Sequence, residues 1–213
     1  MMKKYTKIEE IINGVTHGIG VVFGIVALTI LLIFSIRKGD VSATVSFSIY
    51  GACIILMFLS STLYHSFTKE KVKNVLRVFD HSSIFLFIAG TYTPIVILTL
   101  KGYLRMGILI GIWAMAISGV VFKILTYGKF DKYKLLSLIF YIGMGWVAII
   151  PIKKIIEATS INFFYWILLG GVIYTLGTIF YSIKKIPYNH AIWHLFVLAA
   201  SVTHFVGIFL YLT

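Results

Sequence analysis

Long uncharged apolar runs dominate this chain, and they restrict its fold more than any other feature. Of its 213 residues, 60% are hydrophobic and only 12% are charged. A soluble domain carries about 25% charged residues, whereas the charges here fall in short clusters between the apolar runs. About 20 apolar residues are enough for a helix to cross the ~30 Å hydrocarbon core of a bilayer. The sequence therefore predicts a multi-pass helical membrane protein.

Seven such runs follow one another, which predicts an all-α fold: a single domain formed by a bundle of seven transmembrane helices. The connections between the runs are short, so we expect no second domain. One connection, residues 68–79, carries Val72, Val75, Leu76 and Phe79 at helical spacing among charges, and this pattern favours a segment lying along the cytoplasmic interface. The seven expected spans are approximately residues 11–36, 41–67, 80–100, 105–126, 135–152, 160–183 and 187–212.

The lysines and arginines between the runs are divided unequally between the two sides of the membrane. Thirteen fall on the side of the N-terminus and six on the other. Because cytoplasmic loops carry the excess of Lys and Arg, this split predicts a cytoplasmic N-terminus and a C-terminus outside. The thirteen are Lys3, Lys4, Lys7, Lys69, Lys71, Lys73, Arg77, Lys123, Lys129, Lys132, Lys134, Lys184 and Lys185; the six are Arg37, Lys38, Lys101, Arg105, Lys153 and Lys154.

The net charge of +12 raises the question of a nucleic-acid partner. The cations are scattered through short loops and form no contiguous basic face, which nucleic-acid recognition needs. We therefore expect no nucleic-acid binding. The single cysteine, Cys53, lies within an apolar run, which excludes both a disulfide framework and a thiolate metal site.

Two histidines, His190 and His194, stand four residues apart at the start of the last apolar run. This spacing places them on one face of a helix, separated by about one turn, or ~6 Å of rise. Both imidazoles can then reach one metal ion, as in the His-x-x-x-His zinc signature. Ionisable side chains at the edge of a bilayer are costly and usually functional, so this pair is a candidate metal site.

The predicted topology brings further polar residues to the same membrane face. Ser61 and His65 lie at the cytoplasmic end of the second span, and Asp80 begins the third. Two more histidines share this layer, His17 and His81, and we expect both to hydrogen-bond rather than bind a metal. His204 is the exception, because it lies ten residues beyond His194 and well off its face.

Two other cofactor classes can be compared with these residues. Bis-histidine heme needs ligands on opposite faces of the ring, which His190 and His194 on one helix face cannot supply, although His65 with one of them could. A rhodopsin-like pigment needs a Schiff-base lysine in the last span. The final lysine of the chain is Lys185, before that span, so a retinal pigment is not expected.

At these residues the sequence resembles the hemolysin III family, the bacterial branch of the progestin and adiponectin receptor superfamily. Four blocks carry the resemblance: EEIINGVTHGIG at 9–20, SSTLYH at 60–65, FDHSSIF at 79–85 and NHAIWH at 189–194. They extend over most of the chain, and the Ser-x-x-x-His, Asp and His-x-x-x-His motifs follow in family order.

The resemblance implies a seven-helix bundle in the bacterial plasma membrane with a Zn²⁺ ion near the cytoplasmic face. By matching motif, the zinc ligands would be His65, His190 and His194, with Asp80 and Ser61 beside a zinc-bound water. The receptor members carry additional N-terminal domains, so their hormone binding is not expected here. Relatives are linked to ceramide hydrolysis, to membrane-lipid homeostasis and to lysis of red cells.

Three histidines and a water form the ligand set of a catalytic zinc site. The expected function is therefore a zinc-dependent hydrolase of lipid amides or esters, with membrane lipids as partners. Asp80 would act as general base, and Ser61 would orient the water or the acyl oxygen. Two alternatives remain: a pore-forming or membrane-perturbing cytolysin in which zinc only clamps helices, and a lipid-responsive sensor. The enzyme needs a lipid-sized cavity reaching the metal, and the clamp does not.

Overall fold

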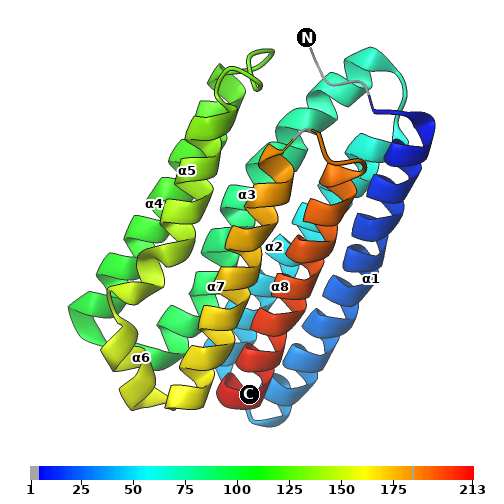
Figure 1. The fold of residues 1–213 in the computed structure, drawn as a ribbon. Coiled ribbons are helices and arrows are strands. Elements are labelled where there is room, and N and C mark those ends of the chain that lie inside the picture. Colours follow the sequence, from blue (N-terminus) through cyan, green and yellow to red (C-terminus); the bar gives the residue numbers. More distant parts are fainter. Residues whose placement is uncertain (1–4, 184) are drawn as a thin grey trace.

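The computed structural model describes residues 5–183 and 185–213, and all regular structure within them is helical. Three residues of the charge argument, Lys3, Lys4 and Lys184, lie outside the described residues. The all-α prediction is confirmed. In chain order the helices of Figure 1 are α1 Lys7–Arg37, α2 Val41–Ser66, α3 Glu70–Thr99, α4 Gly102–Leu125, α5 Lys134–Gly145, the 3-10 helix η1 Trp146–Ile149, α6 Ile152–Ala158, α7 Ile161–Ser182 and α8 Asn189–Leu212.

Six of these helices are long and apolar enough to cross a membrane, counting only the described residues. They are α1, α2, α3, α4, α7 and α8. The segment from α5 through α6 passes the same test only as a bent pair, and counting that pair as one span brings the number to seven. Helix α1 begins and α8 ends at opposite ends of the bundle (Figure 1).

Local side-chain contacts explain where several of these helices begin. Thr6 and Glu9 form a capping box at the start of α1, in which each side chain binds the backbone of the other residue. Asp40 accepts from the backbone N–H of Ala43 at the start of α2. These caps satisfy N–H groups that have no partner within the helix. They fix the first turns of α1 and α2 close to the start of the apolar runs.

Helix α3 corrects one expectation from the sequence. The segment 68–79 does not form a separate interfacial connection, because α3 is continuous from Glu70 to Thr99. Its first turns are held to the end of α2 by Lys73, whose Nζ donates to the backbone oxygens of Tyr64 and Phe67. The apolar residues at helical spacing therefore belong to the first turns of α3 and not to a separate connection, since no glycine or proline separates them from the span.

The fifth expected span, residues 135–152, is broken rather than continuous. Helix α5 ends at Gly145, η1 follows, and α6 starts after a bend of 52°. Gly145 weakens the helix and Pro151 cannot donate a backbone hydrogen bond. The Tyr92 hydroxyl of α3 donates to Gly145 O at 2.7 Å and accepts from Ala148 N at 2.7 Å, so it satisfies two backbone groups that the break leaves open.

Helices α1 and α2 pack in close contact, and the candidate residues lie at one end of this packed pair. A Cβ atom on Gly20 would lie 2.3 Å from the Phe58 ring, so only glycine allows this approach. Figure 1 shows α1 beside α2 and α8. The start of α1, the end of α2, and the starts of α3 and α8 all lie at the same end of the bundle. The candidate residues come from these four helix ends.

Candidate metal centre

Three buried histidines from two helices meet at this end of the bundle. His65 lies in the last turn of α2, and His190 and His194 lie in the first two turns of α8. The Nε2 atoms of His65 and His190 are 3.3 Å apart, and those of His190 and His194 are 3.1 Å apart. Within the described part of the chain, these three are the group of His, Cys, Asp and Glu side chains that could hold a metal ion.

The partners of the Nδ1 atoms show how two of the rings are protonated. His65 Nδ1 lies 2.7 Å from Glu10 Oε2, and His194 Nδ1 lies 3.2 Å from the backbone oxygen of Asn13. A carboxylate and a carbonyl oxygen can only accept, so both Nδ1 atoms are donors. In the neutral rings, the Nε2 atoms of His65 and His194 therefore carry lone pairs directed at the centre of the cluster.

This arrangement of nitrogen atoms fits a metal ion. A tetrahedral zinc ion with Zn–N bonds of about 2.0–2.1 Å holds two ligand nitrogens about 3.3–3.4 Å apart. The observed separations of 3.3 and 3.1 Å are close to that value. The single Nε2–H that His190 could offer cannot bind both neighbouring lone pairs, whereas a cation at the centre binds all three. The 3.3 Å between the Nε2 atoms of His65 and His190 leaves no room for a porphyrin between these two rings, so this pair does not fit a bis-histidine heme.

Glu10 is the contact that reasoning from spacing did not identify. Its carboxylate binds His65 through Oε2 and Lys73 Nζ through Oε1 at 2.8 Å. A carboxylate on the far nitrogen of a metal-binding histidine fixes the ring orientation and raises its basicity. Glu10 does occur in the first block of the family resemblance, but 55 residues separate it from His65. No periodicity in the sequence connects two positions that far apart.

This contact leads to a first prediction. Glu10→Ala should weaken metal binding by about 10–100-fold, the range typical of losing an outer contact of a ligand. Glu10→Gln keeps an oxygen that can accept from His65 and should lose less. Competition titration against a chelator of known affinity measures both. Glu9→Gln is the matched control, since glutamine preserves the capping box of α1; metal affinity unchanged in Glu10→Ala would contradict the role of the carboxylate.

Asp80 and Ser61 lie in the same layer but outside the group of three histidines. The Asp80 side chain is 12% exposed, and its Oδ2 lies 3.5 Å from His81 Nδ1. Its carboxylate also interacts electrostatically with His65, and the buried Ser61 hydroxyl lies beside it as a hydrogen-bond donor, although the geometry of this contact is not ideal. The catalytic roles of Asp80 and Ser61 stay predictions.

The remaining histidines differ in their relation to the cluster. The His17 ring stacks on His194 with centroids 3.5 Å apart and planes at 13°. His81 Nδ1 binds the backbone oxygen of Arg77 and lies away from the three Nε2 atoms. His204 packs against Gly170 and donates from Nε2 to Ile167 O. The stacking of His17 was not foreseen, because it depends on the rotation of α1 against α8.

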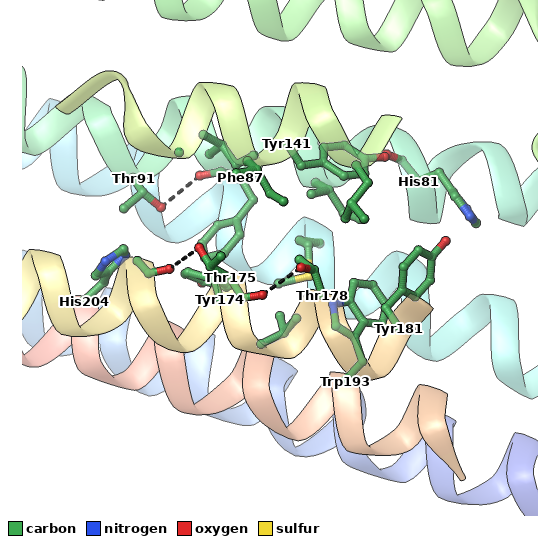
Figure 2. Close-up of a pocket in the computed structure, with 18 of the residues that line it drawn as sticks. His81, Phe87, Thr91, Tyr141, Tyr174, Thr175, Thr178, Tyr181, Trp193 and His204 are labelled. Atoms are coloured by element: carbon green, nitrogen blue, oxygen red, sulfur yellow. Dashed lines mark hydrogen bonds between the residues drawn. The ribbon is translucent and has the colours of Figure 1, made fainter. Parts of the chain in front are cut away.

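A cavity of about 150 Å³ extends from this layer into the bundle (Figure 2). Asp80, His81 and His190 line one end, and His204 lines the other. The 14 residues from His190 to His204 correspond to about 21 Å of helix. Figure 2 shows Tyr141 on one wall and Tyr174, Thr178 and Trp193 on the opposite side. Most of the lining comes from α3, α5, α7 and α8, with His17 of α1, Met57 of α2 and Trp146 of η1 completing it, and it is mainly apolar or aromatic.

Together these features define a class: a multi-pass integral membrane protein with three buried histidines able to hold a metal ion, next to an apolar internal cavity. The family model described as "Haemolysin-III related" matches residues 5–205. The chain belongs to this hemolysin III family, within the progestin and adiponectin receptor superfamily. A location in the bacterial plasma membrane is consistent with relatives from two Bacillus species.

Three relatives show how far the similarity extends. The chain is 46% identical to the "Hemolysin-3 homolog" of Bacillus subtilis, over 97% of this chain and 96% of the relative. It is 44% identical to "Hemolysin-3" of Bacillus cereus, over 99% and 94%. It is 33% identical to the human "Monocyte to macrophage differentiation factor", over 98% and 87%. The likeness therefore covers nearly the whole chain in each case.

Proposed function

We propose that this protein is a zinc-dependent hydrolase that cleaves an amide or ester bond of a membrane lipid. The observation that carries the proposal is the cavity, because it reaches both His190 and Asp80. A metal that only clamped helices would need no cavity beside it. The mainly apolar lining of the cavity extends over ~21 Å of α8, from His190 to His204, so the hydrocarbon part of a lipid next to the scissile bond can enter it.

Zinc is the ion we propose for the three histidines. Imidazole ligands suit zinc, copper, iron and nickel, and a three-histidine set with one position left for a water or substrate is a recurring catalytic zinc site. An ion held by His65, His190 and His194 would supply Lewis acidity and lower the pKa of a coordinated water to about 7. Glu10 and the Asn13 carbonyl hold two of the three rings in the binding tautomer.

The other residues carry the proton and the substrate. Asp80 is placed at the polar end of the cavity, where its carboxylate can accept a proton from the attacking water and return it to the leaving group. Ser61, whose buried hydroxyl lies beside the Asp80 carboxylate, can donate to the acyl oxygen. The aromatic walls keep bulk water from the scissile bond. Turnover of a labelled ceramide-like lipid by zinc-loaded protein in detergent tests the proposal.

A second function is favoured by one comparison. The Bacillus cereus relative is named "Hemolysin-3", so the alternative is a cytolysin that perturbs membranes and in which zinc only holds α2 and α8 together. A lipid-responsive sensor would use the same cavity without turnover. Two tests distinguish the hydrolase from these alternatives. The first is whether the metal-loaded protein cleaves any lipid of a panel, and the second is the Asp80 variant described below.

The proposal includes seven spans, with the N-terminus in the cytoplasm. The bent segment α5 to α6 then counts as one crossing, which agrees with α1 beginning and α8 ending at opposite ends of the bundle (Figure 1). We expect reporter fusions at the N-terminus and after Thr213 to show opposite sides, with the N-terminal reporter inside. Two reporters in the same compartment would contradict the span count, and a reversed pair would contradict the orientation.

A further inference from the structure

The ring of Tyr5, just before α1, covers the histidine cluster at the end of the bundle. Its centroid lies 5.2 Å from that of His190, with the two planes at 28°, and 5.9 Å from that of His65 at 65°. Thr6, the next residue, is the N-cap of α1 and fixes the direction of the chain. Tyr5 is not among the residues that line the cavity. It therefore closes a different side of the cluster.

Within the described residues, the other sides of the cluster are covered by α1 or face the cavity. His17 stacks on His194, and the backbone oxygen of Asn13 binds its Nδ1. The cavity reaches His190, but its walls are mainly apolar. A hydrated divalent cation would have to lose its water to pass there, at a cost of many kcal/mol. The cavity suits an acyl chain and does not suit the metal.

Solvent reaches Glu10, a direct neighbour of the cluster, at the end of the bundle. The Glu10 side chain is 20% exposed and Lys73 is 23% exposed, whereas the His65 side chain is 0% exposed. Glu10 thus touches both solvent and His65. A carboxylate in this position is the first anionic group that an arriving cation meets, and Tyr5 lies beside it over the same histidine.

We propose that the metal is loaded from the aqueous end of the bundle, through a port that Glu10 lines and the Tyr5 ring closes. The lipid uses the separate, apolar cavity. This inference rests on the metal-binding part of the proposed function and does not depend on which reaction the site performs. Tyr5 contributes no ligand; it sets how fast the ion is exchanged.

If Tyr5 closes the port, its loss should change the rate of metal exchange more than the equilibrium affinity for the metal. A contact that only supports the structure would not have this effect. Tyr5→Ala should speed both uptake and release of the ion by about tenfold or more, with a much smaller change in equilibrium affinity, since no ligand is lost. Tyr5→Phe keeps the ring and should exchange at the parent rate. Glu10→Ala should instead lower the affinity itself. Measuring both the exchange rates and the affinity therefore distinguishes the role of the Tyr5 ring from that of the Glu10 carboxylate, which supports His65.

The experiment follows Zn²⁺ release from loaded protein in detergent to an excess of chromogenic chelator, and Zn²⁺ uptake by the metal-free protein. Tyr103→Ala is the matched control, because Tyr103 is 97% exposed at the start of α4. Tyr5→Leu, which keeps an apolar side chain without the ring, provides a second variant if Tyr5→Ala folds poorly. In a second arm, benzene occupies the cavity without offering a ligand, since an apolar cavity of about 150 Å³ can hold a molecule of that size; it should leave the release rate unchanged.

The outcomes are distinct. Faster exchange in Tyr5→Ala and Tyr5→Leu, with parent rates in Tyr5→Phe and Tyr103→Ala, supports the port. Equal release rates from all loaded proteins overturn it and leave the proposed hydrolase untouched. Release that benzene blocks shows that the ion leaves through the cavity, and this also overturns the port. A parent protein that binds no metal overturns both proposals.

Discussion

His190→Ala is expected to abolish stoichiometric metal binding by the purified protein. His190 Nε2 lies between the Nε2 atoms of His65 and His194, at 3.3 and 3.1 Å, so its loss removes the central member of the group. The affinity should fall by more than the ~10–100-fold typical of losing an outer contact. His65→Ala and His194→Ala should behave alike. Metal per chain, measured by elemental analysis after purification, is the readout.

His204→Ala is the matched control for this prediction. It removes a buried histidine from the same helix, but that histidine binds Ile167 O and lies beside Gly170. Its metal content should equal that of the parent. We also expect His81→Ala to keep its metal, and His17→Ala to fall closer to the control than to His190→Ala, since its ring stacks on His194 without belonging to the group of three. Full metal retention in His190→Ala would rule out the site.

Asp80→Asn is expected to have the second large effect. This variant distinguishes a catalytic metal site from a metal that only holds the helices together. Asparagine keeps the size of the side chain but cannot accept a proton at neutral pH. Loss of a general base costs about 10²–10⁴ in rate, so hydrolysis of a lipid amide or ester should fall by that factor. Metal binding should weaken at most ~10–100-fold, since Asp80 lies outside the three-histidine group.

Measuring metal content and lipid turnover on the same preparations tests this expectation. Glu157→Gln is a suitable control, since Glu157 is 60% exposed and forms its ion pair with the similarly exposed Lys154. The cytolysin alternative predicts that metal-loaded Asp80→Asn keeps the full lytic activity of the parent. If the loaded parent cleaves no lipid of a broad panel, and lysis is the same in parent and mutant, the hydrolase is wrong and the clamp is favoured.

The helices were largely predictable from the sequence, because a bilayer imposes a length and a composition on each span. The two departures have local causes. Residues 70–79 carry enough charge to look interfacial, yet no helix breaker separates them from the rest of α3. The break after Gly145 is explained by that glycine and by Pro151. A hydropathy profile does not predict it, because neither residue carries a polar side chain.

The candidate site was predictable only in part. His190 and His194 share a helix, so their spacing alone indicated a common ligand, and the family motifs suggested His65. Glu10 and Tyr5 carry no such signal. Each contacts the cluster from a distant part of the chain, and each contact depends on how α1 is rotated against α2 and α8. Tertiary packing determines that rotation.

The 125 residues between His65 and His190 have a consequence for biosynthesis. Because a membrane protein is made from its N-terminus, His65 is in the bilayer long before α8 is synthesised. The metal site can therefore be completed only when the last helix packs between α1 and α7, and bound metal would then join the earliest and latest parts of the chain. A nascent or truncated chain would lack two of the three histidines, so metal bound at the proposed site would report completed assembly of the whole bundle.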